Sequence, residues 1–243
     1  MRCQRPNKVP CRSNLQPCSA ANALRTHRPP NYPRILTFSS VNGAVQTAPS
    51  ASPEAQAVKA QLLEALQGTD RGIFGTTAAK KAAINDLVAS LEALNPVAAP
   101  IDNLHLCAGS WELLYSTITI TGVKRTKLGL REFIQLEAML QDIDLEKKEA
   151  TNVVQFSVSG LSQFRGALSI RAGYEPASPS RVNINFQEAT LAPAQLQKLF
   201  EKNYDLLLSI FNPQGYLDIT YLDDQHRLGR DDKGNLFVLQ RAR

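Results

Sequence analysis

The spacing of apolar positions divides the chain into a helical region followed by a strand-rich region. Good helix formers fill residues 54–67, with Ser52 placed to cap them and Pro53 at the first helical position. A second segment, from Thr76 or Thr77 to about Leu94, carries its apolar residues on one stripe at helical spacing. A helix pair is therefore predicted within residues 54–96.

From Cys107 onward the apolar period shifts towards two, which is typical of strands. The first strand begins at Trp111 and continues through β-branched residues to Thr121. Further strands are predicted at Met139–Leu145, Asn152–Val158, Phe164–Tyr174, Arg181–Thr190, Tyr216–Leu222, near Arg227–Gly229 and at Leu236–Arg241. One late helix, Pro193–Phe211, interrupts the series.

About eight short strands, joined mostly by hairpin-length turns, favour an antiparallel β-barrel, because closure removes exposed strand edges. The predicted fold is mainly β with flanking helices (α+β), with the barrel over residues 107–243 and helices covering its ends or an outer face. A β-sandwich is the alternative architecture. The interior of an eight-stranded barrel is either filled by side chains or holds one small ligand.

Charge is distributed unevenly along the chain. Residues 1–53 hold six Arg and one Lys and no acid, whereas residues 54–243 hold 20 Lys and Arg against 22 Asp and Glu, a net charge of −2. An acid-free head with scattered Arg and Ser, and no long apolar run, is typical of an organellar transit peptide; a disordered basic tail is the alternative. We therefore predict a cleaved transit peptide at 1–50 and a folded domain at 54–243 that binds no nucleic acid.

The sequence contains no recognisable catalytic or metal-binding motif. Cys107 is the one cysteine beyond the head, and His105 and His226 have no partner at metal-ligand spacing. P-loop, G-x-G-x-x-G and G-x-S-x-G motifs are absent. We expect no cofactor, no metal, no enzymatic activity, and a buried, inert thiol at Cys107.

The single Trp of the chain lies in a motif with a structural meaning. Gly109 and Trp111 form a Gly-x-Trp sequence at the start of the first strand, which is similar to the start of lipocalin barrels. In lipocalins a basic residue near the end of the barrel packs over the indole. Arg227, Arg230 or Arg241 is expected to do so in this chain.

The C-terminal stretch has a more specific resemblance. Residues 215–224 (GYLDITYLDD), 227–231 (RLGRD) and 234–239 (GNLFVL) resemble the signature that ends the plastid lipid-associated proteins, also called plastid fibrillins. Residues 68–72 (GTDRG) and 111–117 (WELLYST) resemble earlier motifs of the same family. The resemblance implies a chloroplast protein with a lipocalin-like barrel that handles a prenyl lipid or another hydrophobic small molecule.

Two further segments, 127–134 (KLGLREFI) and 202–213 (KNYDLLLSIFNP), look most like the fifth fibrillin subgroup. That likeness implies a non-enzymatic protein of the stroma, or one peripheral to the thylakoid or plastoglobule, that partners the long-chain prenyl (solanesyl) diphosphate synthase of plastoquinone biosynthesis. A second hypothesis is a structural protein that coats plastid lipid bodies or thylakoid margins and exposes an apolar patch. A third is an enzyme with an unrecognised site, marked by Asp and Tyr groups of perturbed pKa in a cleft.

The expected ligand-binding residues are apolar positions that the strand period directs into the barrel: Trp111, Leu113, Tyr115, Phe156, Leu168, Ile170, Ile184 and Phe186. Each of them is alternatively a plain core residue. Residues expected at the barrel floor or in a structural motif are Gly109, Trp111, Tyr221, Asp223, Arg227 and Arg230. Of these, Asp223 and Arg230 are expected to pair with each other or to serve the floor.

A basic loop is the remaining candidate site. Its cationic residues are Lys124, Arg125, Lys127 and Arg131. They are expected either to contact a diphosphate or acidic partner, or simply to be solvated.

Overall fold

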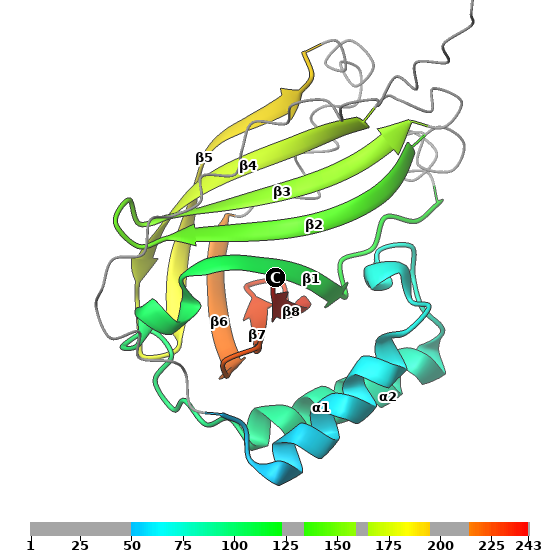
Figure 1. The fold of residues 1–243 in the computed structure, drawn as a ribbon, viewed down its shortest axis with the longest axis vertical. Coiled ribbons are helices and arrows are strands. Elements are labelled where there is room, and N and C mark those ends of the chain that lie inside the picture. Colours follow the sequence, from blue (N-terminus) through cyan, green and yellow to red (C-terminus); the bar gives the residue numbers. More distant parts are fainter. Residues whose placement is uncertain (1–49, 123–133, 159–164, 195–213, 243) are drawn as a thin grey trace, which may run out of the picture. The chain divides into compact units, whose positions relative to one another are not determined.

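The computed structural model describes residues 50–122, 134–158, 165–194 and 214–242. In these ranges two helices, α1 (Pro53–Leu66) and α2 (Ala78–Ala93), precede eight strands (Figure 1). The strands are β1 (Gly109–Ser116), β2 (Ile134–Asp144), β3 (Glu149–Val158), β4 (Arg165–Pro176), β5 (Arg181–Ala192), β6 (Gly215–Leu222), β7 (His226–Asp231) and β8 (Leu236–Arg241). Two short 3₁₀ turns, η1 (Asp70–Gly72) and η2 (Leu104–Cys107), lie before β1. The predicted mainly β fold with an N-terminal helix pair is confirmed.

Both helices begin at the caps that the sequence indicates. The Ser52 hydroxyl accepts a hydrogen bond from the backbone N–H of Ala55 at 3.2 Å, and Pro53 occupies the first helical position. The Thr77 hydroxyl accepts from the N–H of Lys80 at 3.3 Å. Such caps satisfy donors that have no partner inside the helix, which fixes where each helix starts.

The eight strands close into a barrel in simple chain order. Each strand pairs antiparallel with the next, and β8 returns to pair with β1. The strands β2 to β5 have 10 to 12 residues, whereas β6, β7, β8 and β1 have six to eight. The long and short groups join at two narrow seams, β1–β2 and β5–β6, with four residue pairs each.

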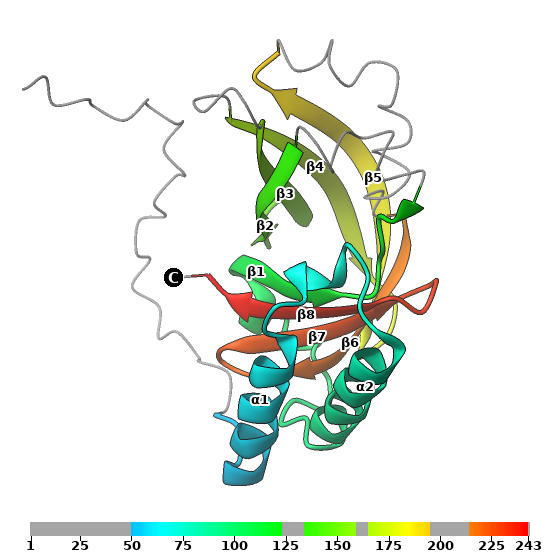
Figure 2. The ribbon, with the colours of Figure 1, turned by 90° about the vertical axis from the view of Figure 1, so that its right-hand side faces the viewer.

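The helix pair covers the outer face of the short strands (Figure 2). Apolar residues of the helices form one buried cluster with side chains of β1, β6, β7 and β8. The strand residues of that cluster are Tyr115, Tyr221, Leu228, Leu236 and Val238. The expectation that the helices cover a barrel end or an outer face is thereby resolved in favour of the outer face.

Two β-bulges decide which side chains face this helical layer. The β1–β8 register shifts between Leu113 and Tyr115, and the β6–β7 register shifts between Ile219 and Tyr221. One extra residue in a strand turns every following side chain to the other face. Leu113 and Ile219 therefore point inward, while Tyr115 and Tyr221 point outward.

The predicted extension of the first strand to Thr121 is wrong. β1 ends at Ser116, after which the chain leaves the sheet and packs Ile120 into the barrel end. The backbone N–H of Ile120 donates to the carbonyl of Ile73 at 2.6 Å, so its partner is the η1 loop rather than a neighbouring strand. Most of the predicted late helix lies outside the described residues.

Candidate ligand cavity

The barrel interior holds two apolar clusters, one near each end. One cluster gathers around Trp111 and the segment before β1, including Ile101, Leu106 and Cys107, which closes the floor. The other gathers Phe156, Leu168 and Ile170 with residues of the η1 loop. The Met139 side chain packs against both clusters, so it marks the level at which they meet.

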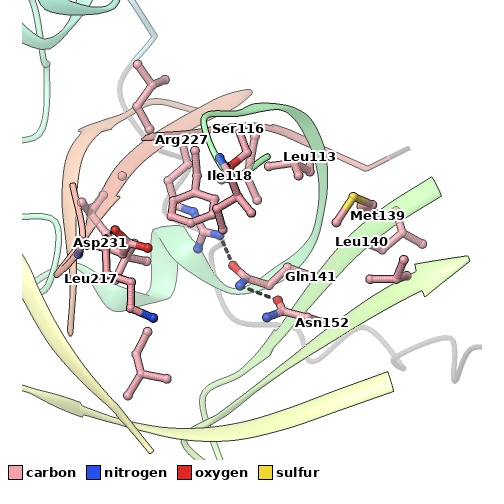
Figure 3. Close-up of a pocket in the computed structure, with 18 of the residues that line it drawn as sticks. Leu113, Ser116, Ile118, Met139, Leu140, Gln141, Asn152, Leu217, Arg227 and Asp231 are labelled. Carbon is pink, nitrogen blue, oxygen red and sulfur yellow. Dashed lines mark hydrogen bonds between the residues drawn. The ribbon is translucent and has the colours of Figure 1, made fainter. Parts of the chain in front are cut away.

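A cavity of about 170 Å³ lies inside the barrel at this level (Figure 3). An apolar cavity of about 150 Å³ holds one benzene, so this cavity has room for about half a dozen carbon-sized groups. Apolar wall residues with inward register positions are Leu113, Met139, Val154, Ile184, Leu217, Ile219, Phe237 and Leu239. A smaller void of about 50 Å³ lies nearer the floor.

Three polar side chains stand on the shared wall of the two cavities and form a chain of hydrogen bonds. Arg227 donates to the amide oxygen of Gln141, and the Gln141 amide nitrogen donates to the Asn152 oxygen at 2.8 Å. Figure 3 shows the three groups directed toward one another. Arg227 comes from β7, Gln141 from β2 and Asn152 from β3, so this chain spans the barrel interior from the short strands to the long ones.

The floor is built around the indole of Trp111, which is fully buried. Its ring N–H donates to the carbonyl of Cys107 at 2.8 Å. The Arg241 guanidinium lies over the ring at 4.3 Å and donates to the carbonyls of Leu106, Ala108 and Asp224. Arg241 thus fills the expected place of a terminal-strand arginine over the indole and ties the η2 turn to the barrel end.

A second guanidinium, that of Arg227, also lies over the Trp111 ring, at 4.9 Å from its centre. Arg227 is only 3% exposed, and burial lowers the pKa of its guanidinium below the ordinary value. The Cys107 thiol lies beside it; burial, the larger effect, raises the pKa of that thiol, while Arg227 opposes the rise. The thiol is therefore neutral and enclosed, as the sequence predicted.

Most of the predicted apolar positions do face the barrel interior. Leu113 and Ile184 line the main cavity. Trp111, Phe156, Leu168 and Ile170 pack in the two interior clusters and do not line it. Phe186 lies opposite Ala172, on the inward face of β5, and is 37% exposed. A ligand-binding role for these residues stays a prediction.

The predicted inward position of Tyr115 is wrong. Beyond the β1 bulge its side chain packs outward against the helix pair, and it is 1% exposed. The period of two that joins Trp111, Leu113 and Tyr115 in the sequence is interrupted by the extra residue, which no local residue pattern reveals.

Tyr221, Asp223 and Arg230, which were expected at the barrel floor or in a structural motif, have a structural role, because all three anchor the helices. Arg230 pairs with Glu92 of α2 through two hydrogen bonds of 3.0 and 3.1 Å, and not with Asp223. The Asp223 carboxylate accepts from Lys59 of α1 and from the Tyr221 hydroxyl, both at 2.6 Å. Gly109, Trp111 and Arg227 are at the floor as predicted.

Sequence reasoning missed Gln141 and Asn152. They are paired opposite each other, between the apolar pairs Met139–Val154 and Ile143–Ala150. A polar residue at an inward position of an otherwise apolar alternation is the signal that could have found them. Lys124, Arg125, Lys127 and Arg131 lie outside the described residues.

Among the described residues, no group of three or more His, Cys, Asp or Glu side chains is arranged to hold a metal ion. Within the same ranges, no helix has the length and apolar character needed to cross a membrane.

The fold and its cavity define a class of protein: a closed antiparallel barrel with a small, largely apolar interior space. The PAP_fibrillin family model matches residues 56–240, which cover most of the chain, and the chain belongs to this family. The predicted family resemblance is therefore confirmed; the subgroup stays a prediction.

Curated relatives agree with this family assignment. The chain is 30% identical to a chromoplast-specific carotenoid-associated protein C2 of an Oncidium hybrid cultivar, over 84% of this chain and 76% of that protein. It is 28% identical to plastoglobulin-1 of Pisum sativum (82% and 68%) and 28% identical to a probable plastid-lipid-associated protein 2 of Arabidopsis thaliana (76% and 71%). The relatives are named as plastid proteins, and the predicted chloroplast localisation is confirmed.

Proposed function

We propose that this chain is a non-catalytic prenyl-lipid-binding protein of the chloroplast that associates with the long-chain (solanesyl) diphosphate synthase of plastoquinone biosynthesis. By holding part of the hydrophobic product, it would relieve inhibition of the synthase. The observation that carries the proposal is the cavity of about 170 Å³ inside the closed barrel. The names of the relatives, which refer to plastid lipid and carotenoid, support a hydrophobic ligand.

The size of the cavity sets how the protein would act. A prenyl chain of about 45 carbons is far longer than the half-dozen or so groups for which the cavity has room. Burying half a dozen CH₂-sized groups is worth about 5 kcal/mol at roughly 0.8 kcal/mol each, before any cost of ordering the chain. The barrel would therefore shield one end of the lipid strongly rather than enclose the whole of it.

The alternative function is a structural protein that coats plastid lipid bodies or thylakoid margins. The name of plastoglobulin-1 among the relatives favours it. Such a coat needs an exposed apolar patch. Within the described residues, the one large apolar side chain that is exposed is Phe186, and this argues for an interior rather than a surface lipid site.

The test is to mix the full chain with a plastid long-chain prenyl diphosphate synthase and to follow product formation with and without detergent. The proposal predicts co-purification of the two proteins and a rise in turnover that detergent abolishes. The proposal is contradicted if the two proteins do not bind each other and turnover does not rise. If the chain then co-floats with lipid droplets, the coat function is favoured.

A variant with a filled cavity tests whether stimulation of the synthase depends on the barrel interior. Met139 and Val154 lie opposite each other on the inward face, so Met139→Phe with Val154→Phe fills the space. The matched control is Thr151→Phe with Ser169→Phe, on the outer face of β3 and β4. The filled variant should lose the stimulation of the synthase, and the control should keep it.

A further inference from the structure

Arg227 differs from the other arginines of the described barrel in what surrounds it. Arg181 pairs with Asp218, Arg230 pairs with Glu92, and Arg241 is bound by three backbone carbonyls. Arg227, which lines both cavities, forms no ion pair with any carboxylate among the described residues.

The groups that surround Arg227 supply no negative charge, and a second cation, Arg241, lies over the same Trp111 ring; the groups that contact Arg227 are neutral. They are the Gln141 oxygen, the Cys107 thiol and the Trp111 ring. A buried cation without a counter-charge is unfavourable, because neutral partners replace only part of the hydration that the charge has lost. An anionic group in the adjacent cavity would supply that counter-charge through charge-assisted hydrogen bonds.

The hydrogen-bond chain also has a direction. The Gln141 oxygen accepts from Arg227, and the Asn152 oxygen accepts from Gln141, so the chain ends on the Asn152 amide NH₂. Every nitrogen of the three side chains is a donor. The part of the wall formed by these three side chains therefore presents mainly N–H groups, which suit a ligand rich in acceptor oxygens.

An apolar wall extends the main cavity from these side chains. Its other polar lining residues lie at the end of β1, at the start of β6 and around the β7–β8 turn: Ser116, Gln214, Tyr216, Asp231, Asp232 and Lys233. From the three polar side chains the lining continues through Met139 and Val154 to Ile73 in the η1 loop. A molecule that fits this wall has an acceptor-rich head at one end and a hydrocarbon tail at the other.

We propose that the cavity binds a single-chain amphiphile with an anionic head group, which contacts Arg227 and Asn152 while its tail lies along Met139, Val154 and Ile73. This inference rests on the lipid-binding part of the proposed function and adds the head group and its position. The anion is of carboxylate or phosphate type and comes from the lipid itself rather than from a free ion.

The test compares probes that share one tail. The full chain is titrated with dodecanoate, 1-dodecanol and acetate at pH 8, below the micellar concentration of dodecanoate and the solubility limit of dodecanol. Trp111 is the only Trp of the chain, and its ring centre lies 4.9 Å from the Arg227 guanidinium, so its fluorescence reports on this site. Dodecanoate should bind at least tenfold more tightly than dodecanol, and acetate should bind much more weakly than either.

Two variants on one strand assign the preference to Arg227. Arg227→Gln removes the interior guanidinium, and Arg230→Gln is the matched control on the opposite face of β7. Calorimetry measures binding independently of the indole. Arg227→Gln should bind both amphiphiles with similar affinity, whereas Arg230→Gln should keep the preference for dodecanoate.

The outcomes separate this inference from the proposed function. Equal binding of dodecanoate and dodecanol by the unmodified chain overturns the anionic site but leaves the lipid-binding cavity intact. A preference that survives in Arg227→Gln also overturns it, and so does acetate binding as tight as that of dodecanoate, since the tail would then contribute nothing. If neither amphiphile binds, both the inference and the proposed cavity function fail.

Discussion

At the residue scale, buried polar groups hold the helices to the barrel. Asp223 is fully buried and accepts hydrogen bonds from Lys59, Tyr221 and the backbone N–H groups of Gln225 and His226. Burial by itself would raise the pKa of Asp223, but these hydrogen bonds outweigh it and hold the pKa below the ordinary value. The C-terminal family motif, which contains Tyr221 and Asp223, thus fastens α1 to the barrel through Lys59 rather than forming a ligand site.

His226 predicts a dependence of stability on pH. Its ring is buried, neither ring nitrogen has a hydrogen-bond partner among the described residues, and burial lowers its pKa below the ordinary 6.5. Below pH 6.5 the unfolded chain takes up a proton that the folded chain does not. The free energy of unfolding should therefore fall with pH from about 6.5 down to the folded pKa, by up to about 1.4 kcal/mol per pH unit.

Urea unfolding of the full chain between pH 8 and pH 5 measures this effect. His226→Leu should remove that part of the dependence of stability on pH. Above pH 7, where neither the folded nor the unfolded chain binds this proton, protonation should change the stability little. The account is contradicted if the unmodified chain and the variant lose stability in parallel. The Asp223 contribution does not interfere, because it is lost only at lower pH, as the pH falls through the depressed pKa of that carboxyl.

The sequence predicted residues of the barrel interior only where a motif or a regular period marked them. Trp111 and Arg227 were found through the Gly-x-Trp motif and its expected cationic partner. Gln141 and Asn152 were not, because a polar residue in a strand normally indicates a solvated face. Their inward position follows from the register of β2 and β3, a long-range property of the sheet.

At the scale of elements, β-bulges limited what the period of two could predict. The existence of all eight strands and both helices followed from apolar spacing and cap residues. The bulges in β1 and β6 turn Tyr115 and Tyr221 outward, and this requires knowledge of the paired strands. The outer face gains two aromatic residues there, which supply the surface on which the helices pack.

The GTDRG motif predicts a contrast between its two glycines. Both have positive φ, +68° at Gly68 and +74° at Gly72. An added Cβ at Gly68 meets nothing within 4 Å, whereas at Gly72 it would lie 2.2 Å from the Ser116 carbonyl oxygen and 2.7 Å from the Tyr115 ring. Gly68→Ala should cost about 1–2 kcal/mol of stability, from the backbone conformation alone.

Gly72→Ala should cost clearly more than Gly68→Ala, because backbone and a buried ring must move as well. Thermal and urea unfolding of both variants measure the difference. Equal losses in the two variants would show that the close approach of η1 to the end of β1 is not needed for stability.

At the scale of the whole molecule, the barrel consists of two four-stranded groups joined at narrow seams. The closed barrel was predicted from strand number and short connections. The unequal strand lengths and the volume left inside were not, because both depend on how the two groups pack. Across the β5–β6 seam, Arg181 and Asp218 form a pair of 2.7 Å hydrogen bonds, and the Arg181 guanidinium stacks on Tyr216.

The seams predict where the barrel opens first. β3 and β4 share nine residue pairs, whereas β5–β6 and β1–β2 share four each. Backbone hydrogen bonds at the seams should therefore break in smaller, local opening events. In hydrogen exchange followed by mass spectrometry, peptides covering residues 181–184 and 215–218 should exchange faster than those of the β3–β4 pairing; uniform protection would contradict this account.

The most direct test of the central claim is whether one lipid occupies the barrel interior. The full chain is incubated with the long-chain prenyl alcohol solanesol, separated from free lipid by gel filtration and weighed intact by native mass spectrometry. The account predicts one lipid per chain, its loss in Met139→Phe with Val154→Phe, and its retention in Thr151→Phe with Ser169→Phe. A chain that carries no lipid, or a filled variant that still carries it, would contradict an interior site.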